Sequence, residues 1–214
     1  MKIGIIGSGS VGGTLGRVLA RKGHDIMFGV RDPQSPKVQS VIEATEGKAK
    51  ADSVAAAAAY GEVVILATPW TATQAAIAQA GNLNGKIVID CTNPIALGLE
   101  GLSQGLVIGH TTSAAEEVAQ WATGARVVKA FNNIGAENYE DITFRSQPAT
   151  GFICGDDQAA KDVVATLGRD IGFEVVDVGE LSKARLLEPL GMLWIHLAIF
   201  KGMGRDFAIN LVKR

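Results

Sequence analysis

Three glycines near the start of the chain, Gly7, Gly9 and Gly12, follow the spacing G-x-G-x-x-G. They come directly after the apolar run at positions 2–7 and before a stretch whose apolar residues repeat with helical spacing. In that setting the first glycine permits a tight turn, the second lets a pyrophosphate approach the backbone, and the third brings helix and strand together. Backbone N–H groups from Ser8 to Gly12 then meet the negative charge at the start of a helix. The motif therefore predicts a dinucleotide-binding loop.

The stretch FGVRDP at positions 28–33 follows this loop by about one helix and one strand. In a dinucleotide-binding unit that separation places it beneath the adenosine ribose, where NAD-binding proteins usually carry a carboxylate. Here Val30 ends the strand and Arg31 is the first charged residue. A guanidinium holds a 2′-phosphate through charge-assisted hydrogen bonds worth about 1.5–3 kcal/mol. We therefore favour NADP over NAD as the cofactor.

Three more residues of the same loop bear on this choice. Ser35 and Lys37 lie close enough in the sequence to join Arg31 around a phosphate. Asp32 counts against a phosphate, because it lies nearer the usual position of a ribose-binding acid and would repel the added charge. Two interpretations therefore stay open, a phosphate clamp and an exposed arginine in a solvated turn, and we favour the clamp.

Polar and aromatic residues follow three later apolar runs, where strands of the predicted sheet end. Thr68, Pro69 and Trp70 follow one run, and Asn93 and Asn132 follow the next two. Because the carboxyl ends of parallel strands meet at one edge, the nicotinamide half of the cofactor passes over these residues. We expect Thr68 to bond the sugar and Pro69 and Trp70 to wall the site, although packing alone explains a Pro-Trp pair equally well. The two asparagines can orient a carboxamide but cannot act as general acids or bases.

No catalytic set emerges from the remaining polar residues. His24, His110 and His196 are scattered along the chain and are interpreted as structural. Lys129 lies inside an apolar run and its role stays open, while Asn133 is uncharged like Asn132 before it. The sequence shows no pattern typical of a Ser-His-Asp set, a metal cluster or a carboxylate pair. We therefore predict a site that positions two redox rings and leaves the chemistry to the cofactors.

Short apolar runs that alternate with helical segments must position these residues. The runs are rich in Val and Ile and do not alternate with polar residues, which is typical of parallel strands covered on both faces. The alternation predicts an α/β fold of the Rossmann type, with a doubly wound, mostly parallel sheet. The runs lie at positions 2–7, 25–29, 63–68, 86–91, 125–131, 151–155 and 173–179.

We expect two parts, a dinucleotide-binding domain at positions 1–180 and a small helical segment at 181–214 that closes the cleft. The second part has helical spacing up to about Met203, with a kink expected at Pro189. Because all faces are apolar at positions 190–200, this helix is predicted to be buried nearly all round, in the body of the protein or against a second subunit. We favour a homodimer that forms through it.

Composition limits the class of protein. The chain has 214 residues, of which 47% are hydrophobic, and its formal net charge is −2. These values are typical of a globular protein and do not suggest a nucleic-acid or membrane surface. Two cysteines without CxxC spacing and the lack of a signal-peptide pattern favour a cytoplasmic protein with reduced thiols. We expect a small-molecule redox substrate and neither nucleic acid nor membrane as a partner.

The sequence resembles the coenzyme F420-dependent NADP reductase family, whose fold also serves as the cytoplasmic reductase domain of membrane ferric reductases. The resemblance spans almost the whole chain. The motifs that carry it are MKIGIIGSGSVGGTLGRVLARKGHDIMFGVRD, VVILATPW, KAFNNIG, GFICGDD and ELSKARLLEPLGMLW, with FKGMG near the end.

The resemblance implies a Rossmann body that holds NADP and a small C-terminal part that closes a narrow cleft. A deazaflavin in that cleft would stack on the nicotinamide, and hydride would pass directly between two ring carbons without a catalytic side chain. By position, the residues implied to contact NADP are Ser8, Ser10, Val11, Arg31, Thr68, Pro69 and Trp70.

Three functions remain in view. The first is hydride transfer between NADP and coenzyme F420. The second is a reductase of the same fold that uses a flavin, a quinone, a ferric complex or an imine. The third is a non-catalytic NADP sensor, which needs the Arg31 end of the cofactor site but no open space over the nicotinamide. An enzyme needs a second pocket beside Thr68, Trp70 and Asn132.

Overall fold

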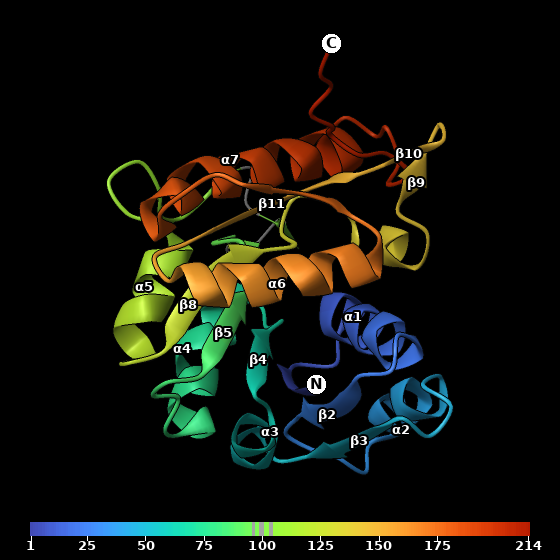
Figure 1. Cartoon of the computed structure of the whole chain (residues 1–214), viewed down its shortest axis with the longest axis vertical. Helices are drawn as coiled ribbons and strands as arrows, with labels where there is room; N and C mark the ends of the chain where they lie inside the picture. The colour runs from blue at the N-terminus through green and yellow to red at the C-terminus, as the bar shows by residue number, and fades with distance from the viewer. Residues whose placement is uncertain (96, 99–100, 103–104) are drawn as a thin grey trace.

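The computed structural model describes residues 1–95, 97–98, 101–102 and 105–214. Strands and helices alternate along most of the chain (Figure 1). The strands are β1 (Lys2–Ile6), β2 (Asp25–Gly29), β3 (Ala49–Asp52), β4 (Val63–Leu66), β5 (Ile87–Asp90), β6 (Leu97–Gly98), β7 (Gly101–Leu102), β8 (Arg126–Ala130), β9 (Thr143–Phe144), β10 (Gln147–Pro148), β11 (Thr150–Gly155) and β12 (Glu174–Asp177). The helices are α1 (Ser10–Arg21), α2 (Pro36–Glu43), α3 (Val54–Tyr60), α4 (Trp70–Ala80), α5 (Ala114–Trp121), α6 (Gln158–Ile171) and α7 (Ala184–Ile195), with short helical turns η1 (Ala136–Glu140), η2 (Leu181–Lys183) and η3 (His196–Phe200).

Eight strands form one sheet in the order β12-β11-β8-β5-β4-β1-β2-β3. Neighbours pair in parallel throughout, except that β11 runs antiparallel to β8. The chain builds outward from β1 through β2 and β3, then crosses to β4 and continues through β5. This reversal lies between β1 and β4, and in such sheets ligands bind beyond the carboxyl ends of the strands at that point. The predicted Rossmann-type, mostly parallel fold is confirmed.

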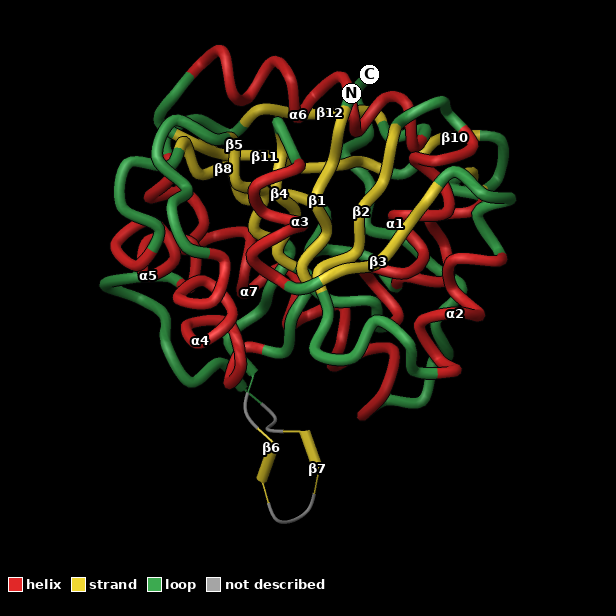
Figure 2. The backbone as a smooth tube through the Cα atoms, turned by 90° about the horizontal axis from the view of Figure 1, so that it is seen from below, coloured by secondary structure: helices red, strands yellow, loops and turns green. Residues whose placement is uncertain are grey.

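Two helix layers cover the sheet. One apolar cluster joins α1 and α6 to one face, through residues such as Leu15, Leu19 and Val164, and the second joins α3, α4 and α5 to the other. Figure 2 shows the strands with α4 and α5 on one side and α1 and α2 on the other. Because both faces are covered, strands β4 and β5 are buried along their whole length, which is why their sequences are continuously apolar.

Within the eight-stranded sheet, one strand had no counterpart among the predicted apolar runs. β3 pairs with β2 at the sheet edge, and its four residues alternate between half-buried and exposed. Its sequence, AKAD, therefore lacks the apolar run that marks the buried strands, because an edge strand needs only one covered face.

The C-terminal part departs from the predicted helix at its end. Helical structure ends at Phe200, and residues 201–214 have neither helix nor strand. The body of the protein also does not bury the helix all round, because Leu186 and Leu193 are 65% and 49% exposed in the single chain. Pro189 lies inside α7, as predicted. In Figure 1, α7 and the chain terminus lie together at the top of the molecule.

Candidate functional site

The glycine-rich loop joins β1 to α1 at the carboxyl edge of the sheet. Gly7 has a φ of 104°, and a Cβ there would lie 2.6 Å from the Ala67 carbonyl oxygen. A Cβ on Gly12 would lie 2.1 Å from the Gly7 carbonyl oxygen. Only glycine fits these two positions, so the loop is held tightly against β4 and α1.

Gly9 differs from these two glycines because nothing lies within 4 Å of the position of its Cβ. It precedes the first turn of α1, whose N-terminus has no side-chain cap and no acidic residue. Ser8 is half-buried, while Ser10 is exposed. The N–H groups at this helix start therefore face open space, which is the arrangement that binds a phosphate anion.

The loop after β2 presents basic groups beside this helix start, since Gly7 N donates to Gly29 O at 3.0 Å. Arg31 and Lys37 are exposed, and within the described part of the chain neither has an ion-pair partner. Ser35 is the residue before α2, and its hydroxyl makes no capping hydrogen bond. These three groups remain free to bind a ligand.

Asp32, the residue that argued against a phosphate, is engaged in its own turn. Its Oδ1 accepts a hydrogen bond from Gln34 N at 3.0 Å. Asp and Asn commonly hold a turn through this contact to the backbone two residues further on. One carboxylate oxygen of Asp32 is therefore directed at the loop backbone.

The Pro-Trp motif lies at the start of α4, after β4. Thr68 Oγ1 lies 2.9 Å from Thr73 Oγ1, and Pro69 is exposed. The Trp70 ring stacks on Trp121 of α5, with 5.2 Å between ring centroids. Trp70 therefore joins two helices by packing, one of the two roles that its sequence left open.

The two predicted asparagines lie against each other at the ends of β5 and β8. Asn132 Nδ2 donates to Asn93 Oδ1 at 2.9 Å, and Asn93 Nδ2 donates to the Asn132 carbonyl at 3.0 Å. Asn132 Nδ2 also donates to Leu187 O of α7 at 2.9 Å. The remaining side-chain acceptor, Asn132 Oδ1, is buried without a hydrogen-bond partner. Gly191 lets α7 approach this pair, because a Cβ there would lie 2.8 Å from Asn93 Oδ1.

A cavity of about 140 Å³ lies beside this pair. It connects the helix start of the glycine loop to the ends of β5 and β8 and to α7. Its wall on the α7 side includes Trp194, whose ring stacks on Phe207 and whose Nε1 donates to Phe207 O at 2.9 Å. Further lining residues are Ser10, Val11, Cys91, Asn93, Asn132 and Arg205. The C-terminal tail therefore holds one wall of a pocket that opens from the dinucleotide loop.

A buried charge cluster that the sequence patterns did not predict lies next to this pocket. Lys129 Nζ contacts Asp90 Oδ2 at 2.9 Å and Glu188 Oε1 at 3.0 Å, and all three side chains are at most 1% exposed. Glu188 also accepts from Ala114 N and Ala115 N at the start of α5, at 2.9 and 3.1 Å. The cluster therefore ties β5, β8, α5 and α7 together beneath the site.

Burial and charge act on this cluster in opposite directions. Burial disfavours the charged lysine, but the carboxylates of Asp90 and Glu188 outweigh it and raise the pKa of Lys129. Burial also raises the pKa of Glu188, against the opposing effect of Lys129. Lys129 is thus held as a cation between two carboxylates, which resolves the role that the sequence left open.

The described residues hold no other set suited to catalysis or metal binding. No group of three His, Cys, Asp or Glu side chains within them could bind a metal ion. His24 Nε2 lies 3.1 Å from Asp170 Oδ2, which is a structural contact. Cys91 and Cys154 are free and buried. Among the same residues, no helix combines the length and apolar composition needed to cross a membrane.

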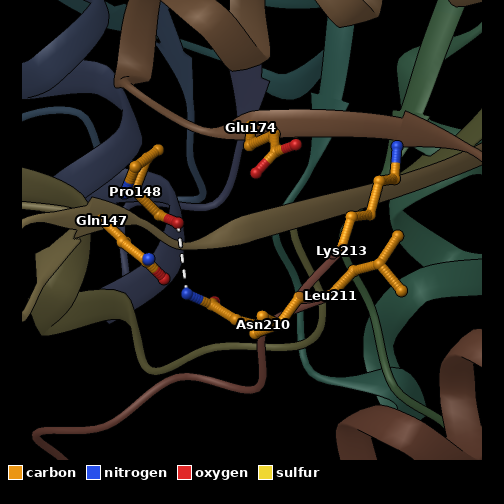
Figure 3. Close-up of a pocket in the computed structure, with 7 residues that line it drawn as sticks. Gln147, Pro148, Glu174, Asn210, Leu211 and Lys213 are labelled. Carbon is orange, nitrogen blue, oxygen red and sulfur yellow. Dashed lines mark hydrogen bonds between the residues drawn. The ribbon is translucent and has the colours of Figure 1, made fainter.

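A second cavity, of about 250 Å³, lies at the β12 end of the sheet and is formed by the C-terminal tail. Figure 3 shows Asn210 donating through Nδ2 to the Pro148 carbonyl in its wall, at 3.2 Å. Glu174 and Lys213 also line it. The glycine loop follows β1, and strands β11, β8, β5 and β4 lie between β1 and β12 in the sheet. This cavity is therefore separate from the predicted dinucleotide site.

The chain is similar to known proteins along nearly its whole length. Residues 2–94 match the model of the family described as NADP oxidoreductase, coenzyme F420-dependent. The chain is 32% identical to the F420-dependent NADP reductase of Methanocaldococcus jannaschii, and the alignment covers 98% of both proteins. It is also 30% identical to the metalloreductase STEAP3 of Rattus norvegicus, over 90% of this chain and 37% of that protein.

Solved structures share the fold. A crystal structure from Arthrobacter sp. FB24, assigned to the F420-dependent NADP reductases, superimposes with a TM-score of 0.90 at 32% identity and covers 100% of both chains. The reductive aminase of Aspergillus terreus in complex with NADPH and ethyl levulinate reaches a TM-score of 0.68 at 19% identity, over 94% of this chain and 62% of that one, a likeness of fold alone. The full-length relative and the family match show that this chain is an NADP-dependent oxidoreductase and belongs to the family of coenzyme F420-dependent NADP oxidoreductases.

Proposed function

We propose that this oxidoreductase transfers hydride between NADP and coenzyme F420, directly from ring to ring. One observation carries the proposal: the cavity beside the Asn93–Asn132 pair begins at the helix start of the glycine loop, where Ser10 and Val11 line it. A single dinucleotide bound at the loop can therefore reach this pocket with its nicotinamide. Besides Ser10, Cys91 and Arg205, the described wall of that pocket consists of amides and apolar groups, which orient rings but do not transfer protons.

The NADP-binding residues are also part of the proposal. The helix start holds the pyrophosphate, and Arg31 with Ser35 and Lys37 holds the 2′-phosphate. Thr68 contacts the nicotinamide ribose, with Pro69 and Trp70 at its side. Asn93 and Asn132 orient the carboxamide, whose N–H group supplies the partner that Asn132 Oδ1 lacks. The glycine-loop contacts are Gly7, Ser8, Gly9, Ser10, Val11 and Gly12.

A second acceptor class has its own support. A metalloreductase aligns with 90% of this chain. A flavin or ferric acceptor is therefore the main alternative to F420. A sensor without catalysis is less well supported, because it needs only the Arg31 end of the site, whereas a cavity is also present at the Asn132 end.

The test mixes the purified protein with NADPH and oxidised F420 and follows the loss of deazaflavin absorbance. Parallel reactions use NADH as donor, and free flavin or a ferric chelate as acceptor. We expect fast bleaching of F420 with NADPH and much slower bleaching with NADH. Tight NADPH binding with transfer only to flavin or ferric iron would replace F420 by the alternative acceptor, and no transfer to any acceptor would favour the sensor.

We also propose that the chain forms a homodimer through the outer face of α7. Leu186 and Leu193 lie seven residues apart on this helix and are exposed, with Ile199 and Met203 beyond them. Exposed apolar side chains grouped in this way are typical of subunit interfaces. Light scattering at micromolar concentration should give twice the chain mass, and Leu193→Glu should reduce it to a single chain. A single-chain mass for the parent protein would exclude the dimer.

The division into a dinucleotide-binding part at 1–180 and a cleft-closing part at 181–214 stays a prediction, as does a cytoplasmic location. Limited proteolysis with and without NADPH tests the division. Cleavage near position 180 should slow when the cofactor is bound, because the cofactor would lie between the two parts.

A further inference from the structure

The buried cluster of Asp90, Lys129 and Glu188 carries an excess charge. Two carboxylates surround one ammonium group, and each of the three side chains is at most 1% exposed. Ion pairing therefore leaves one negative charge inside the protein. Two N–H groups at the start of α5 reduce it only in part, because a helix terminus carries about half an elementary charge. An uncompensated buried charge is costly, so a cation that binds nearby gains from it.

The cluster lies directly behind the proposed nicotinamide pocket. Asp90 is followed by Cys91 and Asn93, and Lys129 is followed by Phe131 and Asn132, all four of which line the cavity. Three residues of extended chain span roughly 10 Å. Between cluster and cavity lie backbone and the amide pair, of which Asn132 is buried and Asn93 half-buried. Little water therefore screens the charge.

The oxidised nicotinamide ring is a cation and the reduced ring is neutral. We propose that the net negative charge of this cluster makes the site prefer NADP⁺ over NADPH, and so makes bound NADPH a stronger hydride donor than free NADPH. This inference rests on the proposed position of the nicotinamide in the cavity. It assigns to the cluster a function in the energetics of the reaction, in addition to its role of joining four elements.

The test compares the dissociation constants of NADPH and NADP⁺ for the parent protein and for Glu188→Gln. The amide keeps the shape of the side chain and an acceptor for α5, but it removes the excess charge. At an effective dielectric constant of about 20–40, one charge roughly 10 Å away changes a binding ratio by about five- to twentyfold. NADP⁺ affinity should therefore fall by that factor relative to NADPH affinity. NADPH fluorescence and NADP⁺ calorimetry give the two constants.

Two control variants separate charge from structure. Glu188→Asp keeps the charge but shortens the side chain. The ratio of the NADPH and NADP⁺ dissociation constants should therefore stay at the parent value, even where both affinities fall. Glu116→Gln removes a carboxylate that also joins α5 to α7, through Arg185, but that pair is partly exposed and screened. Glu116→Gln should therefore also leave the ratio of the two dissociation constants unchanged. Asp90→Asn provides a second neutralised cluster, with the same expected shift, if Glu188→Gln does not fold.

An unchanged ratio in a folded Glu188→Gln protein that still binds both cofactor forms would overturn this inference and leave the proposed function intact. Equal shifts in Glu188→Gln and Glu188→Asp would also overturn it, since they would indicate positioning rather than charge. A parent protein that binds neither form would reject the proposed function, and the inference with it.

Discussion

The carboxyl edge of the sheet has two ends that differ in how their charged groups are paired, the β1–β2 end and the β5–β8 end. At the β1–β2 end, the helix start after Gly9 and the side chains of Arg31 and Lys37 are open to solvent. At the β5–β8 end, Lys129 and its carboxylates are fully buried and bonded to one another. Free charges can bind the phosphates of a ligand, whereas paired charges fix the walls around it. One end therefore offers free charges to the phosphates of a ligand, whereas the other end fixes the shape of the pocket and keeps its charges buried behind the pocket wall.

The largest expected effect on stability comes from removing the cation of the buried cluster at the β5–β8 end. Lys129→Met leaves Asp90 and Glu188 buried without a cation, and we expect a loss of about 3–5 kcal/mol in the free energy of unfolding. Urea unfolding of the protein without cofactor measures this loss. The matched control is Lys161→Met, since Lys161 is also buried but pairs with a partly exposed Asp177 at 2.8 Å. A loss of about 1 kcal/mol or less is expected there. Similar losses in both variants would contradict the comparison.

Substitutions at two glycines of the loop should have different effects, one on NADPH binding and the other on stability. A Cβ on Gly9 meets open space, so Gly9→Ala should leave the unfolding midpoint nearly unchanged. The same methyl group would occupy the space of a pyrophosphate, and NADPH affinity should fall by about tenfold or more. A Cβ on Gly12 meets the Gly7 carbonyl at 2.1 Å, so Gly12→Ala should lower the unfolding midpoint strongly. Thermal melts and NADPH titrations measure the two effects, and full NADPH affinity in Gly9→Ala would place the pyrophosphate elsewhere.

The exposed basic groups at the β1–β2 end should distinguish NADPH from NADH. Arg31→Ala removes a charge-assisted pair, and we expect NADPH affinity to fall by about 10- to 150-fold while NADH affinity stays the same. Arg169→Ala is the matched control, because Arg169 is also an exposed arginine but lies near the end of α6. Fluorescence titration measures both cofactors. If both affinities fall equally in Arg31→Ala, the phosphate clamp is wrong.

The smallest effect concerns the exposed contact between α5 and α7. The hydrogen bond from Arg185 is the main cause that lowers the pKa of Glu116 from its ordinary value of 4.5, against the opposing effect of burial. The ionised form therefore stabilises the fold above pH 4.5, and this contribution is lost as the pH falls through the lower, folded-state pKa. Glu116→Gln should lower the unfolding midpoint by about 2 °C or less at pH 7. Melts across pH 3–7 should show the difference shrinking at the acid end, and a constant difference would contradict this assignment.

Much of the fold could be predicted because buried parallel strands leave a simple signal. The apolar runs at 63–68 and 86–91 contain β4 and β5, and the G-x-G-x-x-G spacing located the turn before α1. The edge strand β3 was missed because only one of its faces needs apolar residues. The end of the helical region was placed three residues too late, since Met203 keeps a helical spacing from Phe200 while Gly202 and Gly204 beside it take positive φ values. Neither local composition nor spacing fixes the antiparallel direction of β11.

The site was predictable where function needs a local motif and not where it needs distant contacts. Gly9 and Arg31 lie in motifs that the sequence displays, whereas Asp90, Lys129 and Glu188 meet only through tertiary structure. A signal was nevertheless present, because each of these three charges stands inside or directly beside an apolar run, in KIVIDC, RVVKAF and LLEPL. Charged residues are almost never fully buried unless they are paired. Three such residues in buried elements therefore predict mutual pairing.

The most direct test of the account is a crystal structure of the complex with NADPH. We predict that the 2′-phosphate lies on Arg31, the pyrophosphate at the helix start after Gly9, and the nicotinamide in the cavity with its carboxamide against the Asn93–Asn132 pair. A nicotinamide outside that cavity, or a 2′-phosphate directed away from Arg31, would contradict the division of the edge into an open end that binds phosphates and a buried end that forms the nicotinamide pocket.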